Sequence, residues 1–362
     1  MSSRKNLIYS IISFVATIGF VFLAISLSGN VYENNKIGYA IFWFVIGALV
    51  VGIFSTFFHE LGHLVFGKKN GFKLISFYFW FFKWSLKGDK YKFNFSFLGE
   101  EFGATEMIST STENVEERFY KMTKGGLIFS SILFMIGIPC IFLTILPFEL
   151  YAILSMLLPI NSYIFLGNAL PSSLDGVRND GGVLYGLKKK DDVSKNTVSL
   201  LKIHTELFLG KSPKEITKDF LFDVPQLPED DINFLMILQA RYNYYLDLED
   251  YEKAAEVLER LESLVEYMPK DFYLIFKAES VYAYSTFIKN LDKADMCVYE
   301  IEKFLNNNNS PLSIRAKLAY ILATDGVSEK FEVFYKKGLK ECSKLQILGL
   351  QKFESKLLEK LK

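Results

Sequence analysis

The sequence predicts an α-helical membrane protein with about four transmembrane helices, a small membrane-associated β-hairpin or sheet, and a C-terminal cytoplasmic α-helical domain. Two observations predict this fold class. The first half of the 362-residue chain is apolar and aromatic, whereas the second half, from about Lys188, is rich in Lys, Glu and Asp. Within the first half, four segments reach the roughly 20 apolar residues that a spanning helix needs. We therefore expect a membrane domain over residues 1–190 and a cytoplasmic domain over residues 191–362.

Uncharged runs define the four predicted spans. These are Leu7–Leu27, Ile37 to about Phe66, about Gly125 to Phe148, and Tyr151 to about Leu170. A signal peptide would also place basic residues before the first run. However, the uncharged stretch from Asn6 to Tyr32 is too long for a typical signal sequence, which favours a retained helix. The link around Pro147 is short, so the last two spans are expected to form a helical hairpin.

Basic residues gather on one side of these four spans. They are Arg4, Lys5, Lys68, Lys69, Lys73, Lys121, Lys124, Lys188, Lys189 and Lys190. The opposite loops hold only Lys36, Glu33 and Glu149. Because an excess of Lys and Arg marks the cytoplasmic side, we expect a multi-pass protein of the cell membrane with both termini in the cytoplasm.

The overall composition excludes some partners. The formal net charge is zero, so no electrostatic argument favours a nucleic-acid partner. The three cysteines, Cys140, Cys297 and Cys342, are far apart and form no CxxC pair, which fits a reducing compartment for the second half.

An aromatic stretch at residues 72–97 separates the second and third spans. Near its end, Lys90, Lys92 and Asn94 alternate with aromatic residues, and residues 87–90 have the composition of a turn. This pattern predicts two or three strands. One interpretation is an amphipathic hairpin that lies on the membrane; the other is a sheet whose edge pairs with an extended peptide.

A polar motif interrupts the second span. In FSTFFHELGHLVFG, residues 54–67, His59, Glu60 and His63 stand among apolar residues, where ionisable groups are costly and usually mark a functional site. Their spacing places both imidazoles on one helical face, where they can share a Zn²⁺ ion. Glu60 can then act as general base toward the metal-bound water. The alternative is a pair of interfacial histidines at a helix end.

A catalytic zinc site needs a third protein ligand. The segment at the end of the fourth span, residues 165–187, offers Asp175 and Asp180, each followed by glycine, and Pro171 breaks the helix before them. For either aspartate alone, a plain Asp-Gly turn at the membrane surface is the alternative.

Three motifs together resemble the site-2 protease family of intramembrane zinc metalloproteases. They are the HExxH motif at residues 59–63, the Asn-x-x-Pro segment at residues 168–171 and the later Asp-Gly, and the likeness covers about residues 37–187. The resemblance implies that His59, His63 and one aspartate bind zinc, that Glu60 is the base, and that Asn168 binds the substrate or the developing oxyanion.

The resemblance leaves the third zinc ligand open between two residues. The family's spacing favours Asp175, whereas the apolar helical stretch that follows Asp180 supplies a rigid support for a ligand. We expect Asp180 to be the ligand and keep Asp175 as the alternate.

The second half contains an internal repeat. Residues 240–254 align with residues 280–294 at an offset of 40, and a looser third copy covers residues 316–331. Repeats of this length and composition resemble tetratricopeptide-like helix pairs, which offer a docking surface for a protein partner. The alternative is an ordinary helical bundle.

These features support one leading hypothesis and two alternatives. The leading hypothesis is an intramembrane zinc metalloprotease that hydrolyses peptide bonds in or near membrane-embedded segments of substrate proteins or peptides. One alternative is a membrane-anchored zinc protease that acts on soluble cytoplasmic peptides and takes its third ligand from the second half. The other is a catalytically silent, membrane-anchored scaffold that binds partners through its repeats, against which the intact Glu60 argues.

Overall fold

The chain forms two compact units in the computed structural model, which describes residues 3–29, 37–87, 90–95, 102–174 and 177–362. The first unit ends at Ser194, and the second consists mainly of residues 195–362.

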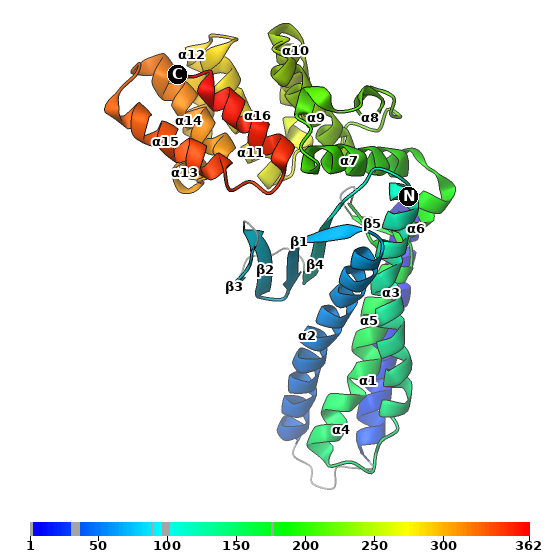
Figure 1. The fold of residues 1–362 in the computed structure, drawn as a ribbon. Helices are drawn as coiled ribbons and strands as arrows, with labels where there is room; N and C mark the ends of the chain where they lie inside the picture. Colours follow the sequence, from blue (N-terminus) through cyan, green and yellow to red (C-terminus); the bar gives the residue numbers. More distant parts are fainter. Residues whose placement is uncertain (1–2, 30–36, 88–89, 96–101, 175–176) are drawn as a thin grey trace. The chain divides into compact units, whose positions relative to one another are not determined.

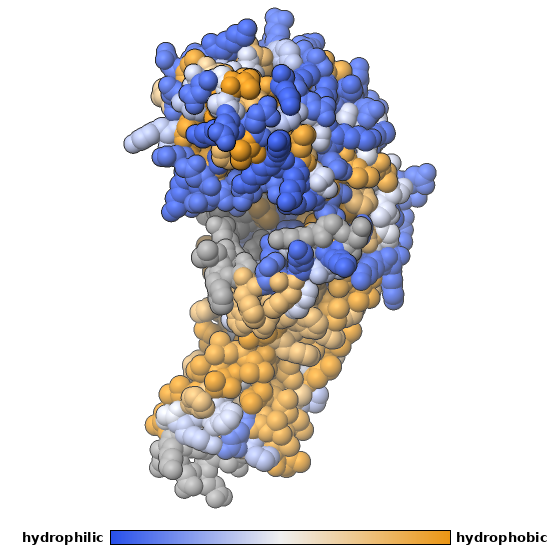
Figure 2. Space-filling view, turned by 60° about the vertical axis from the view of Figure 1, so that its left-hand side comes forward, coloured by the Kyte–Doolittle hydropathy of each residue, from blue (hydrophilic) through white to orange (hydrophobic). Residues whose placement is uncertain are grey.

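The described residues of the first unit form four helical segments that are long and apolar enough to cross a membrane. They are α1 (Ser3–Ser28), α2 (Ile37–Lys69), α3 (Val115–Cys140) and the consecutive pair α4 (Phe148–Ser155) and α5 (Leu157–Ala169) (Figure 1). Large apolar side chains are exposed along these helices, and Figure 2 shows the resulting hydrophobic surface. The predicted number of apolar spans is thereby confirmed in length and composition.

The third span is shifted relative to its predicted position. The helix begins at Val115, ten residues before the predicted start, because its charged first turns are also helical. Glu116 and Glu117 lie there, where negative charge suits a helix N-terminus. The helix ends at Cys140, and turns at residues 141–147 lead to Pro147, whose fixed φ suits the start of α4.

The predicted fourth span consists of two helices that meet at Met156. Pro159 has no backbone N–H, so the hydrogen bond that would continue the helix back to Ser155 cannot form. The two helices nevertheless form one apolar segment, Phe148–Ala169.

Glycines allow α2 and α3 to cross closely. A Cβ atom on Gly62 would lie 2.4 Å from the carbonyl oxygen of Gly125, and a Cβ on Gly125 would lie 2.4 Å from that of Gly62. Small residues of this kind let membrane helices pack backbone to backbone. The crossing therefore fixes the part of α2 that carries the HExxH motif against α3.

A four-stranded sheet follows α2, with strand order β3-β2-β1-β4. The strands are β1 (Phe72–Phe79), β2 (Phe82–Lys87), β3 (Lys90–Phe95) and β4 (Gly103–Ser109). β1 pairs antiparallel with both β2 and β4, and the pairing with β4 shifts register between Leu74 and Ser76. The first three strands match the prediction, but β4 was not predicted; the middle of the predicted turn, residues 88–89, lies outside the described residues.

The sheet packs one face against α2. Leu74, Phe77 and Phe79 of β1 form an apolar cluster with Ile53 and Phe57 of α2. Every described side chain of β3 is exposed. The packing of β1 on α2 brings β4 alongside the HExxH motif.

Two short strands connect α5 to α6 (Asp180–Lys189). They are β5 (Ser173–Leu174) and β6 (Val177–Arg178), which pair antiparallel. The Arg178 guanidinium binds the Asp191 carboxylate through two contacts of 3.0 and 2.9 Å, which ties this hairpin to the end of α6. The bidentate pair holds the connection in one geometry.

The second unit is helical. Its helices are α7 (Asp192–Phe208), which starts in the first unit, α8 (Lys218–Phe222), α9 (Ile232–Leu248), α10 (Tyr251–Glu262), α11 (Lys270–Thr286), α12 (Leu291–Glu300), α13 (Glu302–Asn307), α14 (Pro311–Thr324), α15 (Glu329–Cys342) and α16 (Leu348–Glu359), with 3₁₀ turns at Pro213–Glu215 and Val265–Tyr267. Three successive pairs pack together: α9 with α10, α11 with α12, and α14 with α15. The predicted sequence repeat covers parts of these pairs.

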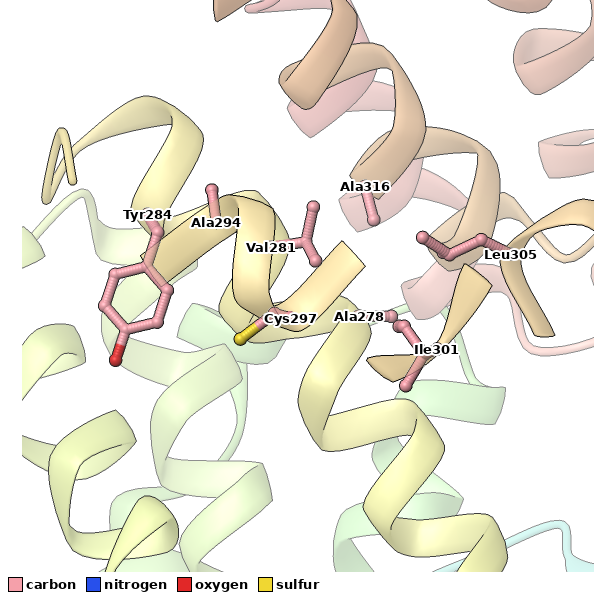
Figure 3. Close-up of a cluster of buried hydrophobic side chains, with 8 residues drawn as sticks. All are labelled: Ala278, Val281, Tyr284, Ala294, Cys297, Ile301, Leu305 and Ala316. Atoms are coloured by element: carbon pink, nitrogen blue, oxygen red, sulfur yellow. The ribbon is translucent and has the colours of Figure 1, made fainter. Parts of the chain in front are cut away.

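Small apolar residues join α11 to its neighbours. The cluster in Figure 3 comprises Ala278, Val281, Tyr284, Ala294, Cys297, Ile301, Leu305 and Ala316, from α11 to α14. Alanines at 0% exposure allow these helices to approach closely, so that α11 forms the centre of this part of the core.

A charged cluster is buried beside this apolar core. Arg315 of α14 is fully buried and donates from Nε to Glu354 and from Nη2 to Glu279, both at 2.8 Å. Its guanidinium also lies 4.3 Å from the ring centroid of Tyr282. The cluster links α11, α14 and α16 through one side chain.

Candidate metal centre

His59 and His63 lie on the face of α2 that meets α3. Their Nε2 atoms are 3.2 Å apart, and their exposed fractions are 6% and 8%. The four-residue spacing brings both rings to one helical face, as the motif predicts. Each imidazole is therefore held in the protein interior rather than turned toward the surface.

Asp180, the first residue of α6, lies against both histidines. Its Oδ2 is 3.4 Å from His59 Nε2 and 3.2 Å from His63 Nε2. Within the described part of the chain, this buried oxygen has no hydrogen-bond partner. Burial raises the pKa of the carboxyl, but the two imidazoles lower it further, to about 2, so the group is ionised at neutral pH. An ionised carboxylate is the form that binds metal ions.

The spacing of the three atoms fits one tetrahedral zinc ion. Zn–N and Zn–O bonds of about 2.0–2.1 Å at tetrahedral angles separate neighbouring ligand atoms by about 3.3–3.4 Å. The observed separations are 3.2, 3.2 and 3.4 Å. Within the described part of the chain, these residues form the one group of three or more His, Cys, Asp or Glu ligands that could hold a metal ion. Geometry alone does not choose among metals with similar ligand sets.

Hydrogen bonds on the far side of each ring turn the Nε2 atoms toward one another. His63 Nδ1 lies 3.2 Å from the backbone oxygen of Met122, which can only accept, so this nitrogen carries the proton. His59 Nδ1 lies 2.7 Å from Ser130 Oγ. With the protons on Nδ1, both neutral rings would present Nε2 lone pairs to a metal ion held between them and Asp180. Such outer contacts typically orient metal-binding histidines.

Gly126 of α3 covers the two rings. A Cβ atom there would lie 2.3 Å from His63 Nε2 and 2.9 Å from His59 Cε1. Any side chain would enter the space between the ligand atoms. The close approach of α3 therefore encloses the centre on this side.

Glu60 lies beside the histidines and contacts the sheet. Thr105 of β4 places its Oγ1 2.6 Å from Glu60 Oε2, and Gly103 leaves so little room that a Cβ would come within 2.9 Å of Glu60 Oε1. The carboxylate is 6% exposed. The unpredicted strand β4 thus determines where this carboxylate lies.

Asn179 joins the end of α5 to the start of α6. Its Oδ1 accepts from the backbone N–H groups of Ser172 and Gly182, both at 2.9 Å. Its Nδ2 donates to the carbonyls of Gly167 and Leu170 at 2.6 and 2.8 Å. This N-cap residue uses its whole amide to place the first turn of α6, and with it Asp180.

The remaining predicted residues lie near this junction. The Asn168 side chain donates to the carbonyl of Ile164 in its own helix at 3.0 Å. A Cβ on Gly181 would lie 2.8 Å from the Asn168 backbone oxygen, so the residue is next to the first turn of α6. Its predicted contact with a substrate stays a prediction. Asp175, the alternate ligand, lies outside the described residues.

Three side chains of this centre were not predicted from the sequence. Ser130 follows Gly126 by one helical turn on α3, a stripe of small residues that signals close packing. Asn179 directly precedes a helix, where Asn is a favoured cap. Thr105 carries no local signal, because only the fold of the sheet brings it to Glu60.

Comparisons with known proteins add no assignment. No protein-family model, curated protein or solved structure matches the chain. The structure itself shows apolar helices suited to a membrane and a group of residues that could hold a metal ion.

Proposed function

We propose that this protein is an intramembrane zinc metalloprotease, which hydrolyses peptide bonds in or near membrane-embedded segments of substrate proteins or peptides. The observation that carries the proposal is the triangle of His59 Nε2, His63 Nε2 and Asp180 Oδ2, with sides of 3.2–3.4 Å, beside a buried Glu60. The resemblance of the HExxH, Asn-x-x-Pro and Asp-Gly motifs to the site-2 protease family supports the same function.

Each residue of the centre has a distinct role in this proposal. His59, His63 and Asp180 hold the zinc ion and leave a fourth position open. A zinc ion held there supplies Lewis-acid activation of water and polarises the scissile carbonyl. Glu60 takes the proton from the attacking water and passes it to the leaving amine. Asn168 exchanges its bond to Ile164 for a hydrogen bond to the substrate backbone.

The position of the centre along α2 supports a membrane-embedded substrate. His63 precedes Lys69, the last residue of α2, by six residues, which is about 9 Å along a helix. The centre thus lies inside an apolar span, near its basic end. A substrate helix must unwind locally to present a peptide bond to it, because side chains and adjacent turns of an intact helix shield the carbonyl carbon from attack.

We also propose that both termini and the second unit lie in the cytoplasm. Basic residues flank the spans on that side, including Lys68 and Lys69 at the end of α2. Digestion of terminal tags in sealed inside-out membrane vesicles tests this orientation. Tags that resist digestion until detergent is added would contradict it.

The second unit is proposed to dock a protein partner through tetratricopeptide-like helix pairs. Three successive packed pairs, α9–α10, α11–α12 and α14–α15, favour this role, which would bring substrates or regulators to the membrane unit. A pull-down with the full chain as bait, beside a variant disrupted in α12, tests this role. If both baits capture the same proteins, the docking role is contradicted. A silent scaffold would need only this docking role.

The cleavage itself is testable without a known substrate. Cells that express the wild-type protein or Glu60→Gln are compared by mass spectrometry of new protein termini in the membrane fraction. We expect termini within or beside membrane spans that require Glu60, because a general base contributes about 10²–10⁴-fold to the rate. Glu106→Gln on the exposed face of β4 is the matched control and should cleave like wild type.

Two other outcomes would contradict the proposal. Termini that depend on Glu60 but lie only in soluble domains would favour a membrane-anchored protease for cytoplasmic peptides. Identical termini in wild type and Glu60→Gln, both well folded, would favour the scaffold.

A further inference from the structure

A cavity lies between α1 and α5, outside the candidate metal centre. Its volume is about 440 Å³, within the usual range for small-molecule sites. Five hydroxyl-bearing residues line it: Tyr9, Ser10, Ser13, Tyr163 and Ser172. None of the described residues that line it is charged. The cavity therefore suits a ligand with neutral hydrogen-bond acceptors and apolar groups.

Ser13 provides an unpaired polar group in this cavity. It is 3% exposed, and its Oγ has no hydrogen-bond partner among the described residues. A buried hydroxyl without a partner costs about 1–3 kcal/mol, which a ligand acceptor would recover. Phe14 and Leu166 supply apolar surface beside it. A ligand with a hydrogen-bond acceptor for Ser13 and an apolar part for Phe14 and Leu166 would match both features.

Hydrogen bonds hold the cavity open at one end. Asn6 of α1 donates from Nδ2 to the backbone oxygen of Ser173 at 2.7 Å. On the opposite wall, the carbonyls of Gly167 and Leu170 accept from Asn179. Both walls are thus fixed before any ligand binds, which lowers the entropic cost of binding.

Polarity changes in a regular order along α1. Lys5, Tyr9 and Ser13 follow one another at intervals of four residues, so they share one stripe of the helix and rise by about 6 Å per step. Lys5 is exposed at the helix start, the two hydroxyls follow, and Phe14 continues into the span. A glycerophospholipid has the same order along the membrane normal: phosphate, ester carbonyls, acyl chain. A spanning peptide has no such order.

We propose that this cavity binds a glycerophospholipid. The ester carbonyls accept from Ser13 and the two tyrosines, one acyl chain packs on Phe14 and Leu166, and the phosphate lies near Lys5. The site is independent of the proposed proteolysis, since none of these residues is a candidate zinc ligand or base.

Native mass spectrometry of the full-length protein tests the proposal. Detergent-purified protein is washed free of lipid and titrated with dioleoylphosphatidylglycerol. We expect one lipid to bind the wild type and the affinity of Gly167→Leu to fall at least about tenfold, equivalent to about 1.4 kcal/mol. Gly167 faces open space, so leucine fills the cavity without a clash. Gly19→Leu, on α1 and also in open space, is the matched control and should bind like wild type.

A second variant guards against misfolding, and three outcomes overturn the proposal. Ser13→Ala removes the hydroxyl without adding volume and should weaken binding severalfold without lowering the melting temperature of the lipid-free protein, because the hydroxyl is unpaired there. Equal lipid binding in wild type, Gly167→Leu and Ser13→Ala would mean a non-specific lipid coat. A wild-type protein that binds none of the added lipid, or that carries a co-purified peptide which the lipid does not displace, would equally contradict the assignment.

Discussion

Single side chains around the centre set the direction in which its reactive atoms point. Ser130 and the Met122 carbonyl lie behind the two imidazoles, and Thr105 lies behind Glu60. None of these groups touches the place where a metal ion would sit. Their effect is to fix which lone pairs face that place, which is the usual role of partners outside the ligand shell.

Thr105 is predicted to position the general base. In Thr105→Val the hydroxyl that contacts Glu60 Oε2 at 2.6 Å is lost while the volume stays similar. We expect kcat to fall about 10–100-fold with little change in KM or zinc content. Cleavage kinetics and metal analysis measure this. Thr105→Ser keeps the hydroxyl and should restore most of kcat; equal loss in both variants would mean that the methyl group, not the hydroxyl, matters.

Gly126 is predicted to tolerate no side chain. In Gly126→Ala the added Cβ would lie 2.3 Å from His63 Nε2, so the histidine must move or α3 must withdraw. We expect loss of bound zinc in a protein that still inserts into the membrane, measured by elemental analysis. Gly19→Ala, where nothing lies within 4 Å of the new atom, is the control. Normal zinc content in Gly126→Ala would show that α3 does not enclose the centre.

At the scale of elements, the junction of α5 and α6 carries the third candidate ligand. Asn179 bonds both to the end of α5 and to the first turn of α6, and Gly181 lets the two backbones approach. His59 and His63 on α2 do not complete a zinc site by themselves. The junction adds the third candidate ligand because it brings Asp180 against both histidines. The centre therefore depends on how three elements, α2, α3 and α6, pack.

Asn179→Ala is predicted to weaken metal binding through this junction. The variant loses an N-cap, which costs about 0.5–2 kcal/mol, and also loses the two bonds to α5. We expect about 10–100-fold weaker zinc binding, measured by competition with a chelator. Asn290 is the N-cap of α12 in the second unit, so Asn290→Ala should cost similar stability there without changing zinc affinity. Equal zinc affinity in both variants would contradict the role of the junction.

In the second unit, Arg315 is predicted to be the charged residue whose replacement lowers the free energy of unfolding most. Arg315→Met leaves Glu279 and Glu354 buried without their partner, and breaking such a cluster costs about 3–5 kcal/mol. Urea unfolding followed by circular dichroism measures the loss. Arg260→Met removes an exposed arginine from its pair with Glu229 and should cost less than about 1 kcal/mol. A similar small loss in both would show that the buried cluster contributes little.

The sequence predicted elements well where a local pattern defines them. The four apolar runs and the HExxH spacing follow from residue type and helical periodicity, and both appear in the structure. Helix ends were less accurate, because the charged first turns of α3 and the break near Pro159 depend on hydrogen bonds rather than on hydropathy. β4 was missed because GATEMIS lacks the alternation of the neighbouring strands and its register includes a shift.

The residues that complete the centre could not be found from local patterns. Thr105 and Ser130 are single hydroxyls on elements distant in sequence from Glu60 and His59, and only tertiary packing unites them. The third ligand could be narrowed to two aspartates, and the helical stretch that follows Asp180 favoured this residue. Its Oδ2 lies within 3.4 Å of both histidine Nε2 atoms, which supports our proposal that Asp180 is a zinc ligand.

At the scale of the whole molecule, the chain combines an apolar helical unit with a helical unit that has its own core. The first unit encloses the candidate centre, and the second offers three packed helix pairs. The proposed protease needs the first unit for chemistry and the second for docking. The proposal fails as a whole if the centre does not bind metal.

Zinc content of the detergent-purified protein is the most direct test of this central claim. Wild type is measured beside Asp180→Ala and Asp175→Ala, with folding checked for each. The proposal predicts about one zinc per chain in wild type and in Asp175→Ala, and its loss in Asp180→Ala, because only Asp180 lies within 3.4 Å of both histidines among the described residues. A folded wild-type protein without zinc, or an Asp180→Ala variant that retains it, would contradict the account.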